Sequence, residues 1–234
     1  MNAIVGMIDH AVLHPTATDD DVREACTLCD GLQVASICVK PCHVPFARSL
    51  LLESRVVVST VIGFPHGGSS TSAKVAETIE ACRFGAREVD MVVNLGKAMA
   101  DDWDYVAADI QAVVAAAAEH QSIAKVIFET GLLASDARKI RLCEICDQAH
   151  AAFVKTSTGF GYAKDASGGL VSTGATVEDV ILMRKHTSDG VQVKASGGIR
   201  SFADAMRMVE AGATRLGTSS TSAIATGGTT TSNY

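Results

Sequence analysis

Aromatic residues are scarce in this chain of 234 residues: they make up 5% of the sequence, with a single Trp. Hydrophobic residues nevertheless reach 47%, so the core must consist mainly of Val, Ile, Leu and Ala. Parallel strands covered by helices usually have cores of this kind. The composition therefore favours an α/β fold over a β-sandwich, and the length suits one domain with a large buried core.

The sequence also lacks a concentration of positive charge and a long apolar run. Its formal net charge is −6 and its 20 Lys and Arg residues are scattered, so no basic stripe could neutralise a phosphodiester backbone. No apolar run reaches the ~18 residues that span a bilayer, and the N-terminus MNAIVGMIDH has no basic start followed by an apolar segment. We expect no nucleic-acid partner, no membrane segment and a cytoplasmic protein.

Disulfide bonds are not expected. The seven cysteines are an odd number, spread through a chain that is long enough to fold without covalent staples. Cys26/Cys29 and Cys143/Cys146 have the CxxC spacing of some zinc sites, but both pairs lie in amphipathic helical patterns where residues i and i+3 share a face. Because no further ligands have matching spacing, we expect core packing rather than a metal site.

Short β-branched runs alternate with helical patterns of about 10 to 18 residues along the whole chain, which is typical of repeated βα units. Eight strands are predicted near residues 7–10, 34–39, 56–62, 88–93, 123–129, 151–157, 191–196 and 213–218. Eight parallel strands can close into a (β/α)8 TIM barrel, whose catalytic groups lie at the C-terminal ends of the strands. An open parallel sheet is the alternative.

No linker or change of composition interrupts this pattern before residue 220, so we expect one barrel domain over residues 1–220. Residues 221–234, TSAIATGGTTTSNY, are small and polar, and we expect them to form a flexible tail. Residue types that cap helices precede the helical patterns and predict where the helices begin. The predicted caps are Thr18, Thr71 or Ser72, Ser135, Thr176 and Ser201.

Charged residues fall on one face of the later strands. Because side chains alternate along a strand, one set faces the helices and the other faces the barrel interior. The interior set contains Glu88, Asp90, Lys125, Glu129, Lys155 and Lys194. An unpaired buried charge costs several kcal/mol, so such a set is either a satisfied ion network or a functional site. We interpret Lys125, Glu129 and Glu88 as a structural network, and the other three as catalytic candidates because they lie near the C-terminal ends of their strands.

Lys155 and Lys194 are expected on adjacent strands, about 4.8 Å apart. At ~4 Å and an effective dielectric constant near 20, a like charge lowers the pKa of a lysine by about three units. One of the two lysines would then be a neutral amine that attacks a carbonyl group. Two lysines and one carboxylate suffice for imine chemistry. One lysine is the nucleophile, the other lowers the pKa of the first, and the carboxylate is the proton shuttle.

Glycines and hydroxyl residues follow the last two predicted strands. The segment SGGIR, residues 196–200, leads directly into a helix, and the segment GTSS covers residues 217–220. Glycines let backbone amides approach an anion at a helix N-terminus. Barrels often hold a phosphate in the loops after strands seven and eight, so the two segments together predict a phosphate site.

Several longer motifs occur in a fixed order over residues 7–220: MIDHAVLHP, ASICVKP, VVSTVIGFPHG, GAREVDMVVNLG, KVIFETGLL, FVKTSTGFG, ATVEDV, VKASGGIR and RLGTSS. Together they resemble the deoxyribose-phosphate aldolases, a family of class I aldolases, and FVKTSTGFG and VKASGGIR are the most specific. The resemblance implies reversible cleavage of 2-deoxy-D-ribose 5-phosphate to acetaldehyde and D-glyceraldehyde 3-phosphate. It implies a homo-oligomer, either a dimer or a tetramer. It implies no metal and no other cofactor.

The resemblance also assigns roles, motif by motif. It implies that Lys155 forms the imine, that Lys194 lowers its pKa, and that Asp90 is the acid/base residue. It implies that the active site is lined by Asp9 and Cys38, although Cys38 also fits the pattern of a small buried hydrophobe. The phosphate contacts that it implies are Thr158, Gly197, Gly198, Ser219 and Ser220.

The chain departs from the family pattern at several places. The first motif reads DHAVLHP, where the family more often has Thr and Leu after the His. The loop 159–175 is longer than expected and is either a mobile lid or an insertion. Lys164 in this loop could add a phosphate contact, and Tyr234 could reach the active site. Two other functions remain open: an imine aldolase for a different aldehyde or keto acid, and a non-catalytic barrel that binds a sugar phosphate.

Overall fold

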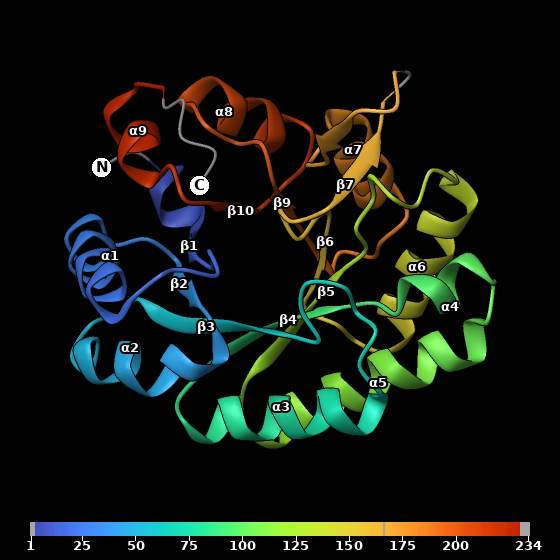
Figure 1. The fold of residues 1–234 in the computed structure, drawn as a ribbon, viewed down its shortest axis with the longest axis horizontal. Coiled ribbons are helices and arrows are strands. Elements are labelled where there is room, and N and C mark those ends of the chain that lie inside the picture. Colours follow the sequence, from blue (N-terminus) through green and yellow to red (C-terminus); the bar gives the residue numbers. More distant parts are fainter. Residues whose placement is uncertain (1–2, 166, 230–234) are drawn as a thin grey trace.

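The computed structural model describes residues 3–165 and 167–229. Eight parallel strands close a barrel in the order β1-β10-β9-β6-β5-β4-β3-β2, and helices surround it (Figure 1). The predicted (β/α)8 barrel is confirmed. The open sheet is wrong, because the first and last strands pair in parallel through Ile8 and Leu216.

All eight barrel strands lie at or close to the segments that were predicted. They are β1 (Ile8–Val12), β2 (Ser36–Val39), β3 (Val57–Ile62), β4 (Glu88–Val92), β5 (Ile123–Ile127), β6 (Phe153–Lys155), β9 (Gln192–Ser196) and β10 (Arg215–Thr218). Two further strands, β7 (Tyr162–Lys164) and β8 (Leu170–Ser172), pair antiparallel outside the barrel.

The α-helices are α1 (Asp19–Leu32), α2 (Val44–Leu50), α3 (Thr71–Arg83), α4 (Leu95–Met99), α5 (Trp103–Glu119), α6 (Asp136–Gln148), α7 (Val177–Lys185), α8 (Phe202–Glu210) and α9 (Thr221–Thr226). Two 3-10 turns are η1 (Val5–Met7) and η2 (Pro41–His43). Across residues 3–165 and 167–229, no helix has both the length and the apolar character that a membrane crossing requires.

Most of the predicted helix caps are confirmed. Thr18, Thr176 and Ser201 each accept a hydrogen bond from a backbone amide in the first helical turn, which satisfies a donor that has no partner within the helix. Ser135 is the N-cap of α6 without a side-chain cap bond. The cap predicted at Thr71 or Ser72 is wrong: Ser70 caps α3.

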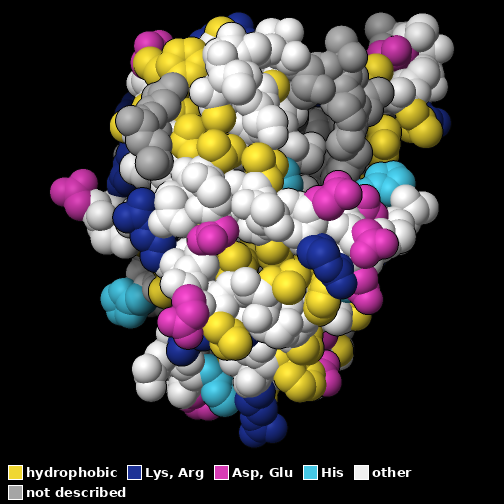
Figure 2. Space-filling model, turned by 90° about the vertical axis from the view of Figure 1, so that its left-hand side faces the viewer, with side chains coloured by type: hydrophobic (Ala, Val, Ile, Leu, Met, Phe, Trp, Pro, Cys, Tyr) yellow, Lys and Arg dark blue, Asp and Glu magenta, His cyan; other side chains and the backbone are white. Residues whose placement is uncertain are grey.

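The hydrophobic core fills the layer between the barrel and its helices. Outward-facing strand residues such as Met91 and Val126 are fully buried there. The thiols of both CxxC pairs are free and buried in α1 and α6, so the interpretation of these pairs as helical core positions is confirmed. Figure 2 shows the surface at the left of Figure 1, where charges of both signs are interspersed with small apolar patches.

The packed structure continues past residue 220. In α9, Thr221 and Ile224 are buried, and the Thr221 hydroxyl lies 2.8 Å from Nδ1 of His10 on β1. The prediction of a flexible tail from residue 221 is therefore wrong for residues 221–226, because one apolar anchor and one buried hydrogen bond attach them to the barrel. Tyr234 lies outside the described residues.

The long loop 159–175 contains the β7–β8 hairpin, which projects from the barrel (Figure 1). Leu170 and Tyr162 of this hairpin are exposed, at 71% and 57%. At its base, the amide of Thr173 donates to the carbonyl of Gly161, and the amide of Ala175 donates to that of Gly197. The hairpin is thereby attached to the loop that follows β9.

Candidate active site

A cavity of about 740 Å³, its open mouth included, lies at the C-terminal ends of the barrel strands. It is lined by nearly all the residues that the sequence singled out: Asp9, Cys38, Lys155, Thr158, Lys194, Gly197, Gly198, Ser219 and Ser220. The exception is Asp90, which is fully buried and contacts both lysines. The barrel thus brings residues from both ends of the chain to one place.

Lys155 and Lys194 are direct neighbours across β6 and β9, where their Cα atoms are paired in register. Both side chains are buried, with 4% and 1% exposed. The two Nζ atoms each lie 2.8 Å from the same oxygen, Oδ2 of Asp90. One carboxylate oxygen therefore bridges the two amines.

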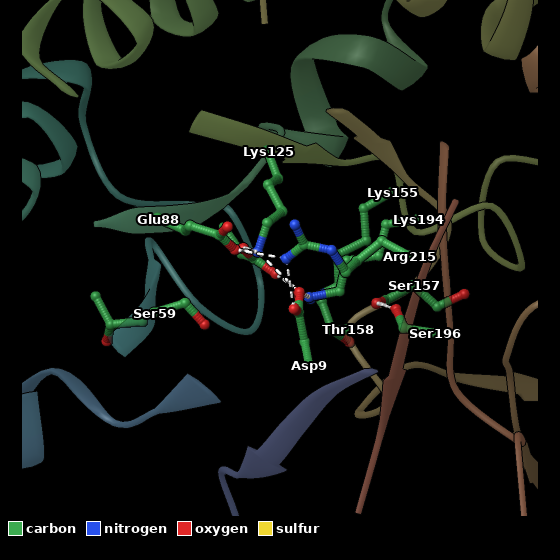
Figure 3. Close-up of polar contacts among 12 residues, drawn as sticks. Asp9, Ser59, Glu88, Lys125, Lys155, Ser157, Thr158, Lys194, Ser196 and Arg215 are labelled. Carbon is green, nitrogen blue, oxygen red and sulfur yellow. Dashed lines mark hydrogen bonds and ion pairs between the residues drawn. The ribbon is translucent and has the colours of Figure 1, made fainter. Parts of the chain in front are cut away.

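The ion network extends from these lysines toward the N-terminal end of the barrel, where side chains from six strands converge (Figure 3). Asp9 Oδ2 lies 2.5 Å from Nζ of Lys194 and 2.8 Å from Nζ of Lys125. Arg215 Nη1 lies 2.6 Å from Asp9 Oδ1 and 2.9 Å from Glu88 Oε2. The lysines at the cavity are therefore coupled to charges that do not line it.

The predicted structural network of Lys125, Glu129 and Glu88 is correct only in part. Nζ of Lys125 lies 2.6 Å from Glu88 Oε2 and 2.9 Å from Asp90 Oδ1, so this lysine belongs to the same network as the catalytic candidates. Glu129 lies two residues past the end of β5 and has φ 55°, so the alternation of the strand does not extend to it. Its Oε2 accepts hydrogen bonds from the amide and hydroxyl of Thr158 instead.

The two lysines differ in proton affinity. Burial, reinforced by the charge of Lys194, lowers the pKa of Lys155 against the opposing effect of Asp90. Burial also disfavours the charged form of Lys194, but the carboxylates of Asp9 and Asp90 outweigh it and raise its pKa. The lowered pKa of Lys155 has the direction that the sequence predicted, but burial is a larger cause than the second lysine.

Another part of the cavity lining consists largely of glycines and hydroxyl residues. Gly197 and Gly198 have φ 87° and 79°, a conformation that glycine adopts without strain. Gly217 leaves room for the catalytic candidates, because a Cβ there would lie 3.1 Å from Cε of Lys194. Ser219, Ser220 and Thr158 complete this lining.

Residues 3–227 match the model of the DeoC/LacD family aldolases. The chain belongs to this family. It is therefore an aldolase, a carbon–carbon lyase, and the predicted resemblance to deoxyribose-phosphate aldolases is confirmed by its relatives.

The deoxyribose-phosphate aldolase of Carboxydothermus hydrogenoformans is 49% identical over 219 residues, 93% of this chain and 91% of the relative. That of Caldanaerobacter subterraneus subsp. tengcongensis is 46% identical, with 92% and 89% covered. Two solved structures are also similar. The aldolase QR15 has a TM-score of 0.86 at 37% identity, covering 97% of this chain and 96% of that one. The Aeropyrum pernix deoxyribose phosphate aldolase has a TM-score of 0.84 at 30% identity, covering 94% and 88%.

Two arginines of the aldolase were not named as site residues from the sequence. Arg200 lines the cavity beside the glycines, and its place at the end of SGGIR was the available signal. Arg215 faces the interior, since it lies two residues before Gly217 on β10 and side chains alternate along a strand. Lys164 is exposed on β7 and is not among the residues that line the cavity.

Proposed function

We propose that this aldolase reversibly cleaves 2-deoxy-D-ribose 5-phosphate to acetaldehyde and D-glyceraldehyde 3-phosphate through an imine on Lys155. The observation that carries the proposal is a single cavity with a buried amine of lowered pKa in one part and a glycine and hydroxyl lining in another. The names of its relatives support the substrate, since they are deoxyribose-phosphate aldolases at 49% and 46% identity. The biological role would be deoxyribonucleotide catabolism.

In the forward direction, the neutral amine of Lys155 adds to the sugar aldehyde, and the adduct takes up a proton and loses water, which gives a protonated imine. Loss of the C3 hydroxyl proton drives cleavage of the C2–C3 bond, whose electrons move into the imine to form an enamine. D-glyceraldehyde 3-phosphate leaves, the enamine is protonated at C2, and water releases acetaldehyde and regenerates the amine.

We assign the acid/base role to Asp90, acting through Lys194 or a water. Asp90 is fully buried, and despite that burial the neighbouring Lys125, Lys155 and Lys194 hold its pKa well below the ordinary value. It therefore carries a negative charge in the resting enzyme. Lys194 lines the cavity and contacts Asp90, so its ammonium group is placed to pass a proton between this carboxylate and the substrate.

We assign the phosphate group to the lining formed by Thr158, Gly197, Gly198, Ser219 and Ser220, with Arg200 supplying a positive charge. Backbone amides freed by glycines and hydroxyl donors are the groups that bind phosphate in such loops.

Replacing Arg200 by Gln should raise the KM for the phosphate ester about tenfold. The KM for unphosphorylated 2-deoxyribose is the internal control and should not change.

Asp9 and Cys38 have supporting roles in this proposal. Asp9 accepts from Lys194 and so orients its amine toward the cavity. Burial raises the pKa of the Cys38 thiol, so it remains protonated and lines the cavity as a small, weakly polar group.

The decisive experiment is borohydride trapping in the presence of acetaldehyde, followed by peptide mass spectrometry. An ethyl group should appear on Lys155, and Lys74, an equally buried lysine away from the cavity, should stay unmodified. A label on another lysine would contradict the mechanism. Tight binding of the sugar phosphate without any label would favour the non-catalytic barrel, and faster cleavage of a keto acid than of deoxyribose 5-phosphate would favour the other imine aldolase.

We further propose that the protein is a cytoplasmic homo-oligomer. Seven free cysteines, four of them paired at CxxC spacing without a disulfide, fit a reducing compartment. The structure of the Aeropyrum pernix relative is described as tetrameric. Light scattering during size-exclusion chromatography distinguishes a monomer, a dimer and a tetramer, and a monomer at micromolar concentration would contradict the proposal.

A further inference from the structure

Seven charged side chains form one continuous network in the barrel interior. Its cations are Lys125, Lys155, Lys194 and Arg215, and its anions are Asp9, Glu88 and Asp90. With every group charged, the network has one cation more than it has anions. An uncompensated buried charge is energetically costly. One of the four cations should therefore lose its proton more readily than the others.

The contacts identify which proton this is. Lys125 lies within ion-pair distance of three carboxylates, and Lys194 and Arg215 each contact two. Among the described residues, Lys155 forms an ion pair with Asp90 alone, and it shares that carboxylate with two other lysines. The network is therefore neutral when Lys155 has lost its proton and the other three cations keep theirs.

Glu88, Lys125 and Arg215 contribute to this balance from outside the cavity, since they are not among its lining residues. Glu88 is 7% exposed and Lys125 is fully buried. The Phe153 ring packs beside both cations, 5.9 Å from Nζ of Lys125 and 5.0 Å from Cζ of Arg215. Figure 3 shows this part of the network beside the two lysines of the cavity.

We propose that Arg215 and Glu88 are positioning residues that act on Lys155 through the charge count of the network: Arg215 adds the positive charge that favours the unprotonated amine, and Glu88 partly offsets it. The inference rests on the proposed function, in which Lys155 is the nucleophile. It assigns a role in the reaction to two residues that do not line the cavity.

Other titratable groups also face Lys155. Asp90 faces it from β4, Lys194 from β9, Cys38 from β2 and Glu129 from the end of β5. Burial raises the pKa of Cys38 and of Glu129, and no ion pair to Glu129 occurs among the described residues. These groups are the same in every variant considered below, so their effects cancel in a comparison between variants.

The test is the pH dependence of imine formation on Lys155, measured by borohydride trapping with acetaldehyde in four proteins: wild type, Glu88→Gln, Arg215→Gln and the double variant. Arg215 lies two strands from Lys155, since Arg215 pairs with Lys194 and Lys194 pairs with Lys155. At about 10 Å and an effective dielectric constant near 20, one charge shifts a pKa by about one unit.

The expected shifts have opposite signs. Glu88→Gln leaves a surplus of positive charge and should lower the apparent pKa of Lys155 by about one unit, whereas Arg215→Gln should raise it by about one unit. The double variant restores the charge balance and should return close to wild type. Arg215→Lys keeps the charge and should also stay close to wild type.

A merely structural role would not produce this pattern. Shifts of the same sign in the two single variants, or a double variant that does not return toward wild type, would overturn the inference. If Arg215→Gln does not fold, as judged by its thermal melting, Lys125→Gln removes a cation from the same network and should shift the pKa in the same direction.

A second readout separates this inference from the proposed function. The rate at which acetic anhydride acylates Lys155 reports the protonation of the amine without any aldolase chemistry. If acetaldehyde does not label Lys155 in the wild type, the proposed function fails, and the acylation profiles of the same variants still decide the charge-balance inference.

Discussion

Lys74 and Lys155 are both buried lysines that contact an aspartate, yet they belong to different kinds of site. Nζ of Lys74, on α3, lies 2.6 Å from Asp109 of α5 and 2.9 Å from the carbonyl oxygen of Val92. The other oxygen of Asp109 accepts from Thr71 at 2.8 Å. Lys155 instead shares the carboxylate of Asp90 with two other lysines and faces a cavity.

This comparison teaches that burial alone does not produce a reactive amine. A lysine with its own counter-charge and a second acceptor, such as Lys74, forms a closed pair away from the cavity. A lysine whose counter-charge is already shared can give up its proton, and the cavity gives it access to a carbonyl group. The predictions below test whether these two arrangements behave as differently as their contacts indicate.

The largest effect is expected at Lys155. Lys155→Met should lower kcat by about a thousandfold or more, because Lys194, the other lysine in the described cavity lining, has a raised pKa. Its free energy of unfolding should stay the same or rise, because the substitution removes a buried amine that lacks its own counter-charge. Steady-state kinetics and urea unfolding measure the two quantities, and retained imine formation in the variant would contradict the assignment.

Lys74→Met is the matched substitution at the closed pair of Lys74 and Asp109. Unlike Lys155→Met, it should lower stability and leave activity unchanged. It leaves Asp109 buried without a cation, so the free energy of unfolding should fall by about 3–5 kcal/mol. The kcat of the folded fraction should be unchanged. Urea unfolding and active-site titration check both quantities, and equal stability of the two Met variants would remove the distinction between the sites.

Lys194→Leu tests how much the neighbouring cation contributes. The amines of Lys194 and Lys155 both lie 2.8 Å from one oxygen of Asp90, and a like charge at ~5 Å is worth about two pKa units at an effective dielectric constant near 20. Without the charge of Lys194, the pKa of Lys155 should rise and the pH profile of borohydride trapping should shift to higher pH. The reactivity of Lys155 at pH 7 should then fall about a hundredfold. An unchanged profile would leave burial as the only cause of the lowered pKa.

Glu129 provides the smallest effect, as a buried carboxylate without an ion pair in the described part of the chain. Burial raises its pKa from 4.5 in the folded protein, so the unfolded chain releases this proton first and stability is lost as the pH rises through the folded value. Glu129→Gln should therefore change the free energy of unfolding little at pH 4 and raise it at pH 8 by about 1 kcal/mol or less. Stabilisation of the variant at pH 4 but not at pH 8 would contradict the predicted pH dependence.

The sequence predicted the barrel because its strands are short, β-branched and regularly spaced. It missed the β7–β8 hairpin, since Tyr162–Lys164 and Leu170–Ser172 are three-residue strands without a buried face. Helix α9 was missed for a related reason: Ile224 is the one large apolar residue in a small, polar stretch. Elements that depend on a few tertiary contacts leave little periodicity in the sequence.

Strand alternation identified most of the charged residues of the interior, without Asp9 and Arg215, but not how they are connected. Glu129 was assigned to the wrong partners because β5 ends at Ile127 and Glu129, with φ 55°, lies beyond the strand alternation. The sharing of Asp90 among three lysines depends on how the strands pair. Residue identities at the site were therefore predictable, whereas the distribution of protons among them required the structure.

The contact between Asp9 and Arg215 joins residues that are 206 positions apart in the sequence. On the ribosome, the strand that carries this aspartate is made first and the strand that carries the arginine is made last. A partial chain therefore lacks part of the interior network, and the two lysines of the cavity acquire their final surroundings only when the ring of strands closes. Enzymatic activity is consequently a sensitive report on complete folding, because no stable fragment of this chain could hold a finished site.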